Sequence, residues 1–336
     1  MPTVRVCSIN GEWMNRWFTR DAEATAQFLP SFSAEDAAPA RLAATIEAIG
    51  AEIVAIQEAP SREAEMQLFV GQYLGDYEFF LSDAGGQQKL ALLYKPDAVD
   101  SAALARHEDI AGLIDEWEAD VDGDAVLDGY GFTRTPLVVD LVVGGHPLQV
   151  VVAHMKSNFI NQGKELWESP ANRQAYITSA LKNRRRISTE GKRTRSYLDA
   201  RASADPGAAI IVLGDLNDGP GLDYFEDLYL THNVTDIIAG SVFAPELAFA
   251  HAQHDVPADK RFTAEFEDFV PEPAMKRLLL DHVMVSPGLL GANGLRKVDG
   301  SGAVYHAEYD AHVSGNGDDR NDRPTDHRPV GVDLAY

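Results

Sequence analysis

Short runs of aliphatic residues recur along the whole of this 336-residue chain, with glycine or polar residues between them. Four or more consecutive aliphatic residues bounded in this way are typical of a strand that is buried on both faces. The clearest example is the segment 209–213, which reads Ala-Ile-Ile-Val-Leu and is followed by glycine and acidic residues. The pattern predicts strands at 4–9, 53–56, 77–82, 89–94, 137–143, 148–153, 209–213, 279–285 and 329–334.

Apolar residues with helical spacing lie between some of these runs. They predict helices at 37–50, 61–74 and 171–187. The strands at 137–143 and 148–153 are joined by the short loop Gly144-Gly145-His146, which favours an antiparallel hairpin. Hairpins mixed with crossovers indicate an α/β or α+β sandwich rather than a purely parallel, doubly wound sheet.

The chain contains no internal repeat and no linker rich in proline, glycine or serine. We therefore expect one domain over residues 1–336. Three acidic segments without periodicity look like insertions, at 106–130, 240–275 and 300–323. We expect the last of them to form a mobile surface loop.

Charge and composition restrict the class of protein. The net charge is −23 and the pI is near 4.7, so the surface as a whole repels nucleic acid and argues against non-specific, tight DNA binding. The single cysteine, Cys7, excludes an internal disulfide framework. No run approaches the roughly 18 apolar residues of a membrane span. We expect a monomer that is cytoplasmic as given, and secretion stays open if a leader was removed.

One basic segment opposes the overall charge. Seven of the 29 lysines and arginines lie between residues 182 and 195, among them Arg184, Arg185 and Arg186. Two interpretations remain open: a solvated helix end, or a patch that holds a phosphate chain or a nucleic-acid backbone through contacts that do not depend on sequence.

Polar residues follow several of the predicted buried strands. The run 53–56 stops at Gln57-Glu58, the run 150–153 stops at His154, the run 209–213 stops at Gly-Asp215-Leu-Asn217-Asp, and the leucines 278–280 stop at Asp281-His282. An unpaired buried charge costs several kcal/mol or more, so repeated carboxylates at strand ends indicate a site at one edge of a sheet. The candidate residues are Asn10, Glu58, His154, Asp215, Asn217, Asp281, Asp326 and His327.

These donors suit a particular chemistry. Hard oxygen ligands from several strands favour Mg²⁺ or Mn²⁺, and zinc is disfavoured because the chain has neither a cysteine pair nor a His-x-x-x-His spacing. Carboxylates and histidine beside such an ion are the groups needed to attack a phosphorus centre with water. Singly, each residue also has a structural explanation: Asn10 as a turn former, His154 as a core histidine, Asp281 as a strand end and Asp326 as the cap of a turn.

The order of the motifs along the chain resembles the endonuclease/exonuclease/phosphatase superfamily. The resemblance rests on Ser8-Ile9-Asn10, Gln57-Glu58, Ala153-His154, Gly214-Asp215-Leu216-Asn217-Asp218, Asp281-His282-Val283 and Thr325-Asp326-His327-Arg328-Pro329-Val330. It spans the chain from the first strand to the last, and the Gly-Asp-Leu-Asn-Asp and Asp-His-Arg-Pro-Val motifs are its specific parts. The resemblance implies a four-layer sandwich, in which two mixed, mainly antiparallel sheets are flanked by helices and the site lies at one end.

The resemblance also implies roles for the metal ligands. Glu58 would be the main Mg²⁺ (or Mn²⁺) ligand, with Asn10 beside it, and Asp326 would be a second carboxylate that sometimes acts through water. Whether one or two ions act stays open.

For the reacting groups, the resemblance implies that Asp215 orients or deprotonates the attacking water and that Asn217 binds the scissile phosphate. His327, oriented by Asp281, would contact a phosphate oxygen or serve as the base instead. His154 would contact the phosphate or protonate the leaving oxygen. Which group is the base stays open.

The segment His154-Met-Lys156-Ser-Asn158 resembles a His-x-Lys-Ser pattern of nuclease-like members of the superfamily. Alternation places Lys156 on the same side as His154, where its ammonium can reach a phosphate. We take Asn158 as a further substrate-binding candidate. Arg134 matches a position that supplies a cation near the phosphate, although an ordinary surface arginine before a strand is an equal alternative.

The leading hypothesis is a Mg²⁺- or Mn²⁺-dependent phosphodiesterase, a nuclease acting on DNA, RNA or nucleotides through metal-assisted attack by water. A second hypothesis keeps the enzyme class but gives it small phosphorylated metabolites, sugars or lipid headgroups as phosphatase or phosphodiesterase substrates. A third is a non-catalytic binding protein on the same fold, which predicts the loss of Glu58, Asp215 or His327; all three are present.

Overall fold

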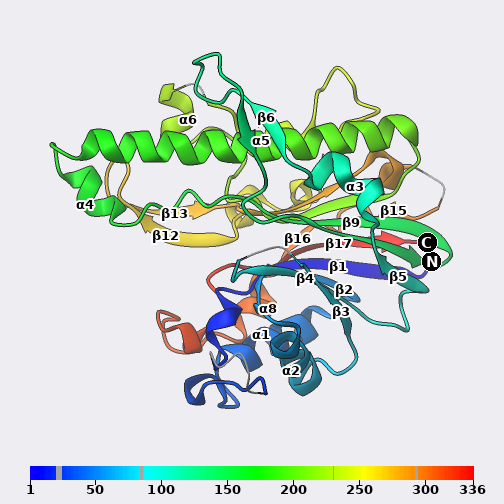
Figure 1. Ribbon diagram of the computed structural model, residues 1–336. Helices are drawn as coiled ribbons and strands as arrows, with labels where there is room; N and C mark the ends of the chain where they lie inside the picture. Colours follow the sequence, from blue (N-terminus) through cyan, green and yellow to red (C-terminus); the bar gives the residue numbers. More distant parts are fainter. Residues whose placement is uncertain (20–24, 84–85, 230, 292–293) are drawn as a thin grey trace.

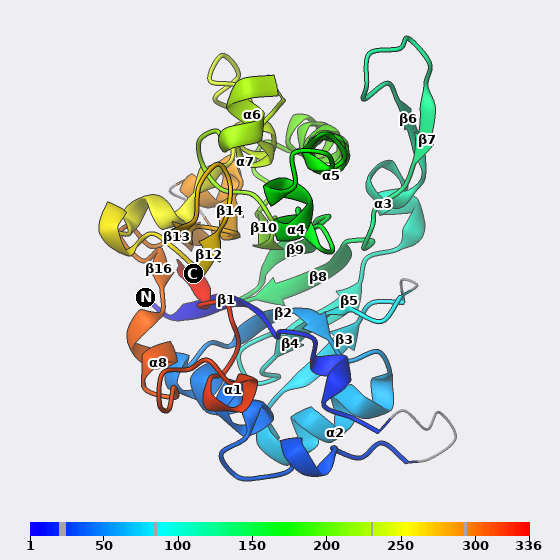
Figure 2. The same ribbon diagram turned by 90° about the vertical axis from the view of Figure 1, so that its left-hand side faces the viewer.

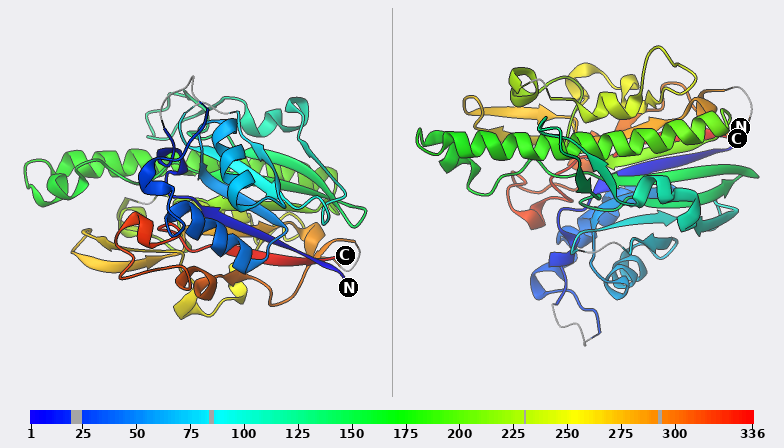
Figure 3. Two further views of the ribbon diagram at one scale, coloured as in Figure 1. Left: turned by 90° about the horizontal axis from the view of Figure 1, so that it is seen from below. Right: turned by 45° about the horizontal axis from the view of Figure 1, so that its top comes forward.

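The computed structural model of the protein describes residues 1–19, 25–83, 86–229, 231–291 and 294–336. Two β-sheets pack face to face, and helices cover the outer face of each, so that the elements form four layers (Figure 1). This is the α/β fold with two mixed sheets that the sequence predicts. The views from below and from an oblique angle show the long helix lying across one sheet and the two termini close together at one end (Figure 3).

The first sheet contains both ends of the chain. Its order is β15-β17-β1-β2-β4-β3, and β16 also pairs with β17. Its central pair, β1 and β2, is parallel, whereas β17 and β4 run antiparallel to it. The strands are β1 (Thr3–Asn10), β2 (Ile53–Ala59), β3 (Glu78–Leu81), β4 (Lys89–Tyr94), β15 (Arg296–Lys297), β16 (Ala303–Val304) and β17 (Val330–Ala335).

The second sheet repeats the same plan. Its order is β11-β14-β10-β9-β8-β5, and a parallel pair, β9 and β10, again lies between the antiparallel strands β8 and β14. The strands are β5 (Ser101–Leu104), β8 (Leu137–Val143), β9 (His146–His154), β10 (Ile210–Asp215), β11 (Ala250–His251) and β14 (Asp281–Val285). Two small hairpins lie outside both sheets: β6 (Trp117–Ala119) with β7 (Asp128–Tyr130), and β12 (Ala264–Asp268) with β13 (Ala274–Leu278).

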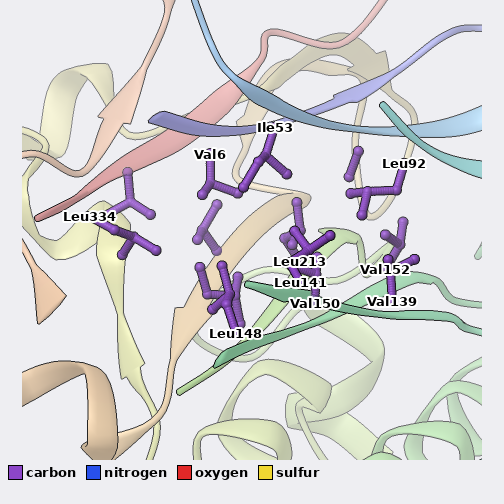
Figure 4. Packing of buried hydrophobic residues seen from close by; sticks show 14 of the residues in the cluster. Val6, Ile53, Leu92, Val139, Leu141, Leu148, Val150, Val152, Leu213 and Leu334 are labelled. Carbon is purple, nitrogen blue, oxygen red and sulfur yellow. The ribbon is translucent and has the colours of Figure 1, made fainter. Parts of the chain in front are cut away.

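The main core lies between the two sheets, and strand alternation explains it. In β2, Ile53 and Ala55 face the opposite sheet, whereas Val54 and Ile56 face the helices, and all four are fully buried. Figure 4 shows side chains of the two sheets meeting in this core, for example Val6 from one sheet and Val150 from the other. Burial on both faces is the reason that the strands have continuous aliphatic runs.

Helices pack on the outer faces. The helices α1, α2 and α8 cover the first sheet, and α5 with α3 and α7 covers the second (Figures 1 and 2). Proline in its first turn and the left-handed Gly50 after its last turn set the ends of α1. The helices are α1 (Ala38–Ile49), α2 (Glu63–Tyr73), α3 (His107–Ile114), α4 (Gly163–Glu168), α5 (Arg173–Ala204), α6 (Tyr224–Tyr229), α7 (Val234–Ala239) and α8 (His306–Asp310). Short 3₁₀ turns are η1 (Met14–Arg16), η2 (Pro30–Phe32), η3 (Ala252–Asp255), η4 (Ala258–Lys260), η5 (Pro287–Leu290) and η6 (Arg320–Asp322).

All nine strand regions and all three helical regions that the sequence predicts contain elements of the expected type. The hairpin between β8 and β9 has the expected tight turn, with positive φ at both Gly144 and Gly145. Within the described residues, no helix is both long and apolar enough to cross a membrane, and that includes α5 despite its 32 residues.

Two expectations need correction. The helix predicted at 171–187 continues to Ala204, because Tyr197, Leu198 and Ala202 are buried against the sheet in its second half. The three acidic segments are also not simply irregular. The first contains α3 and the hairpin of β6 and β7, the second contains β11 and β12, and the third contains β16 and α8. Their short elements bury few apolar side chains, so periodicity does not reveal them.

Candidate active site

The two central parallel pairs bring the site together. Asn10 ends β1 beside β2, which carries Glu58, and His154 and Asp215 are paired residues at the ends of β9 and β10. Residues from the two facing sheets meet at this edge, where Asn10 Nδ2 donates to Asp215 Oδ2 over 3.0 Å. The sandwich therefore collects at one end the polar residues that follow its buried strands.

Asp281 reaches the same edge in a different way from the one the sequence suggests. The leucines before it do not form a strand that ends at Asp281: Leu278 ends β13, and Asp281 is the first residue of β14. Because β14 runs antiparallel to β10, its start lies beside the end of β10, and Asp281 pairs with Asp215. Similarly, His327 precedes β17, which is antiparallel to β1.

His327 and Asp281 form a close pair. His327 Nδ1 lies 2.7 Å from Asp281 Oδ2, and Asp281 is fully buried. Burial of His327 opposes its charged form, but the negative charges of Asp281, Asp326 and Asp215 outweigh that effect and raise the pKa of His327 well above its usual value. The raised pKa favours the imidazolium form, in which Nδ1–H donates to Asp281 and a second N–H is available to a ligand.

Asp215 has a different environment. Its Oδ1 accepts from the backbone N–H of Asn217 at 2.8 Å, and its Oδ2 accepts from Asn10. Burial raises the pKa of Asp215 to about 7, with a further contribution from Asp281, although the charge of His327 opposes the shift. A carboxylate with a pKa near neutrality is suited to accept a proton at physiological pH.

His154 is buried between the two carboxylates. Its Nε2 lies 3.4 Å from Asp215 Oδ2 and 3.9 Å from Glu58 Oε1, and the side chain is 1% exposed. Burial, together with the positive charges of Arg134 and His327, lowers the pKa of His154 well below its usual value. The ring is neutral, and a neutral imidazole can donate from only one nitrogen.

The orientation of the Asn10 amide is set by its neighbours. Its Oδ1 accepts from the backbone N–H of Glu12 at 3.0 Å, so Nδ2 must point to the carboxylates of Asp215 and, at 3.5 Å, Glu58. The oxygen expected to lie beside a metal therefore already has a partner. In this arrangement Asn10 acts as a donor that bridges the two carboxylates.

Glu58 is held firmly in place. Its Oε2 accepts from the backbone N–H of Trp13 at 2.7 Å. Burial raises the pKa of Glu58, and the nearby negative charge of Asp326 raises it further. A divalent cation beside Glu58 would offset the burial and the neighbouring negative charge that oppose its ionisation, and carboxylate oxygens are the ligands that Mg²⁺ and Mn²⁺ prefer.

A second group of donors can also be considered for a metal. Ligand atoms of Asp215, Asp281 and His327 all lie within 4.8 Å of one another. However, His327 Nδ1 is already hydrogen-bonded to Asp281, and the raised pKa of the ring favours its protonated form, in which it does not coordinate a cation. The side with Glu58 and Asp326 therefore suits the ion better, and the side with Asp281 and His327 suits an anion.

The backbone at the site is unusual. Glu12, Trp13, Glu58 and Asn217 all have positive φ, between 51° and 59°, although none of them is glycine. Such conformations cost on the order of 1–3 kcal/mol each and gather where a site must be held in a fixed geometry. Gly214 shows the same constraint in another form: at φ 139°, a side chain there would overlap the carbonyl oxygen of Ala153 on the neighbouring strand.

Cationic and amide groups lie on the β9 side. Arg134 donates to the side chain of Gln88 and to the carbonyl oxygen of Met155, and burial lowers its pKa. Burial, together with the charge of Arg134, lowers the pKa of Lys156, whose Nζ donates to Ser157 O at 2.7 Å.

The two predicted asparagines lie on this side as well. Asn217 Nδ2 donates to the carbonyl oxygen of Met155 at 3.1 Å, and Asn158 Nδ2 donates to the carbonyl oxygen of Asn217 at 3.0 Å. These bonds leave each amide with a further N–H group. The two asparagines and the two cations therefore share one side of the site.

Two supporting residues escape the sequence analysis. The carboxylate of Glu190, fully buried in α5, accepts from Thr133 N and from Lys156 N, and so holds the segments of Arg134 and Lys156 in place. Gln88 accepts from Arg134 at 2.7 Å. The only signal in the sequence is an acid inside a basic segment, which is too weak to identify Glu190.

The basic segment on α5 has other partners. Arg184 pairs with Asp223 and lies over the ring of Phe225. Arg186 donates to the carbonyl oxygen of Gly131 and to Glu190. Both guanidinium groups therefore have partners within the protein, and neither needs a ligand to explain its presence. The contacts also attach the long helix to its neighbouring segments. The phosphate-binding role suggested for Arg184, Arg185 and Arg186 stays a prediction.

Comparison with known proteins agrees with this architecture. The model of the endonuclease/exonuclease/phosphatase family matches residues 10–327, which include every residue of the site described above. The chain belongs to this family. The family's name joins nucleases and phosphatases, both of which hydrolyse phosphate esters. A search of curated proteins found no match to the chain.

Solved structures of family members share the fold. TDP2 from D. rerio, complexed with a single-stranded DNA product, has a TM-score of 0.54 at 14% identity, with 99% of each chain covered. The human nocturnin catalytic domain with bound sulfate has a TM-score of 0.53 at 15% identity, covering 100% of this chain and 94% of that one. A family protein from Bacteroides vulgatus has a TM-score of 0.52 at 12% identity, with both chains fully covered. At these identities the likeness shows a common fold.

Proposed function

We propose that this protein is a Mg²⁺- or Mn²⁺-dependent phosphodiesterase that hydrolyses nucleic acid or nucleotides. The observation that carries the proposal is the contrast between two neighbouring groups. His327 is held as an imidazolium by Asp281, whereas the pKa of Asp215 is raised to about 7. Groups whose environments push their pKa values apart are the usual basis of an acid–base pair.

From this contrast we propose the roles that the sequence leaves open. Asp215 accepts the proton of the attacking water, because it is the group that is ionised but only weakly acidic near neutral pH. His327 already carries both protons, so it cannot be the base; it donates to a phosphoryl oxygen as negative charge develops there. Asp281 positions this ring and balances its charge.

The lowered pKa keeps the His154 ring neutral, with a single proton, and its Nε2 is the nitrogen that faces Asp215. We propose that it orients that carboxylate. In this role Nε2 is directed to the Asp215 carboxylate and not to the leaving oxygen.

Glu58 and Asp326 would hold the metal ion, since they are the pair of hard donors that repel each other. When bound, the ion polarises a phosphoryl oxygen and neutralises developing charge. Arg134, Lys156 and the side-chain amide of Asn217 would bind the remaining phosphate oxygens from the other side. Several cationic and amide donors on one side of the site favour a substrate in which the phosphate is part of a longer nucleotide chain.

The second hypothesis, a phosphatase or phosphodiesterase for small metabolites, keeps one supporting observation. The chain has a net charge of −23, and Arg184 and Arg186 of its basic segment are engaged with other residues. A long duplex would therefore meet a repulsive surface beyond the site. A short or single-stranded substrate avoids most of that repulsion.

A panel of substrates tests the proposal. Single-stranded DNA, duplex DNA, RNA, bis-p-nitrophenyl phosphate and p-nitrophenyl phosphate would be incubated with Mg²⁺ or Mn²⁺. The Asp215→Asn variant serves as the blank, and Asp97→Asn, at an exposed turn, as the matched control. We expect cleavage of oligonucleotides by the wild type and by Asp97→Asn only. Turnover confined to the monoester, or equal activity in Asp215→Asn, would overturn the proposal.

A further inference from the structure

We propose that Trp13 is a stacking platform for the nucleobase beside the scissile phosphate, so that the substrate is an unpaired nucleotide at a single-stranded site or chain end. The inference rests on the proposed function and deepens it. Hydrolysis itself needs no other reactant: water adds to phosphorus, the P–O bond to one sugar breaks, and a phosphomonoester and a free hydroxyl group result.

Trp13 is in direct contact with the catalytic centre through its backbone. Its N–H donates to Glu58 Oε2 at 2.7 Å. The indole is therefore carried by the same residue whose backbone N–H contacts Glu58, the carboxylate proposed to hold the metal. The side chain therefore starts beside the proposed metal ligand, and a nucleobase carried by a sugar next to the bound phosphate would lie within its reach.

The exposure of Trp13 contrasts with its neighbours. Trp13 is 37% exposed, whereas Met14 and Trp17, on the same short segment, are fully buried. Met14 and Trp17 anchor the segment in the core beneath α1 and α2. The anchored segment therefore leaves part of the Trp13 indole accessible beside Glu58, where a ligand at the site can reach it.

The backbone that presents the indole is held rigidly. Gly11 N donates to Gln57 O at 2.8 Å, and the Glu12 carboxylate pairs with Arg323 at 2.7 Å. Glu12 and Trp13 both have left-handed φ values, of 51° and 59°. A strained backbone fixed by several contacts pre-organises the ring, and pre-organisation reduces the entropy lost when a base stacks on it.

A cation lies against the indole. The guanidinium carbon of Arg16 is 4.2 Å from the centre of the Trp13 ring, and this is the only cation–π or ring–ring contact of Trp13 in the described part of the chain. An aromatic ring beside an arginine is the combination that binds single-stranded nucleic acid, because the ring stacks on the base while the cation attracts the backbone. A base in a duplex has both faces covered, so the platform favours an unpaired base.

The platform also distinguishes substrate classes. Every nucleobase has a π face, so stacking on Trp13 tolerates different sequences. A sugar phosphate or glycerol phosphodiester has no such face and gains nothing from the indole. The inference therefore predicts discrimination against substrates without a base, whereas phosphate binding alone predicts none.

Kinetics with three matched dinucleotides test this. One carries a base on both sides of the phosphate. Each of the other two has a tetrahydrofuran residue in place of one base, on either side of the phosphate, so that both positions are tested. We expect Trp13→Ala to raise KM for the base-bearing substrate about tenfold or more, and to leave KM unchanged for one of the two abasic substrates. Trp13→Phe should restore most of the loss. Alanine keeps the backbone N–H that holds Glu58, so a change in kcat alone is not expected.

Fluorescence gives a readout that does not depend on turnover. Trp13 is more exposed than Trp17 or Trp167, which are 0% and 8% exposed. In the inactive Asp215→Asn background, we expect the base-bearing dinucleotide to quench tryptophan emission, and Trp13→Phe to remove that quenching. Phe243→Ala, which removes a 95% exposed aromatic in a different loop, is the control and should change neither measurement.

The outcomes separate the two proposals. If Trp13→Ala changes KM equally for the base-bearing and both abasic substrates, the platform is wrong. The same conclusion follows if it changes KM for none of them. In both cases the proposed nuclease activity stands. If the wild type cleaves no diester but Trp13 is still quenched by the dinucleotide, the proposed function is wrong and the platform is supported. If none of the dinucleotides quenches tryptophan emission, the platform is wrong.

Discussion

Asp281 and His327 are 46 positions apart in the sequence, and Asp281 Oδ2 lies 2.7 Å from His327 Nδ1. The two residues come from different sheets: Asp281 begins β14, and His327 precedes β17. Their contact crosses the sandwich and keeps the imidazole charged at the edge where Asp215 and Glu58 also lie. The charge state of the site therefore depends on the packing of the two sheets against each other.

The first prediction concerns the pH profile of kcat/KM. In the wild type, activity should rise with pH as Asp215 ionises, around pH 7, and fall at a pH well above 6.5 as His327 loses its proton. In Asp281→Asn, the largest of the three negative charges that raise the pKa of His327 is gone, and burial is opposed only by Asp326 and Asp215. The falling limb should therefore move to lower pH, and kcat should decrease by about 10²-fold or more. An unchanged falling limb in this variant would show that another group controls it.

The second prediction concerns the metal. The pKa of Glu58 is raised, so its ionised form destabilises the metal-free protein above the usual pKa of a glutamate. Glu58→Gln should therefore raise the Tm at pH 8 without metal, and should shift half-maximal activity to higher Mg²⁺ concentration. Mg²⁺ should raise the Tm of the wild type more than that of the variant. A variant that is stabilised equally by Mg²⁺ would place the ion elsewhere, for example at Asp215.

The third prediction concerns Asp218, three residues after the end of β10. Burial raises its pKa to about 7, and Glu226 adds to the shift. Between pH 4 and 7 the folded state retains a proton that the unfolded state has lost, so the free energy of unfolding should fall as pH rises, by about 1.4 kcal/mol per pH unit from this residue. Denaturation of the wild type and Asp218→Asn across this range isolates the contribution. The stability difference between wild type and Asp97→Asn, at an exposed turn, should not change in this way.

The fourth prediction concerns the basic segment of α5. Arg184 donates to Asp223 and lies over Phe225. Arg184→Ala should lower the free energy of unfolding by about 1–3 kcal/mol, because it removes a charge-assisted hydrogen bond and a cation–π contact, and should leave KM for an oligonucleotide unchanged. Lys182→Ala, on an exposed position of the same helix, is the control for stability. A tenfold rise in KM with unchanged stability would restore the phosphate-binding interpretation.

Much of the fold could be predicted because burial on both faces leaves a direct trace in the sequence. Ile53 and Val54 face different layers, and both must be apolar, so β2 appears as a continuous aliphatic run. The second half of α5 could not be predicted in this way. Its buried apolar residues are only Tyr197, Leu198 and Ala202, and its other buried positions include charged residues such as Glu190 and Arg195.

Interactions that involve the backbone also escaped prediction. The Glu12 N–H group sets the direction of the Asn10 amide, and the Trp13 N–H group holds Glu58. These contacts depend on left-handed backbone conformations that the residue types themselves disfavour. Local propensity therefore points away from the geometry that the site adopts.

The sequence by itself determined which residues are available for chemistry. Carboxylates, amides and histidines at the ends of buried strands are too costly to be accidental in such numbers, so the pattern alone distinguishes Glu58, His154 and Asp215. Only the tertiary structure decided what each group does. Protonation depends on burial and on charges brought close from distant segments. The packing of the two sheets against each other raises the pKa of His327 and of Asp215 and lowers the pKa of His154.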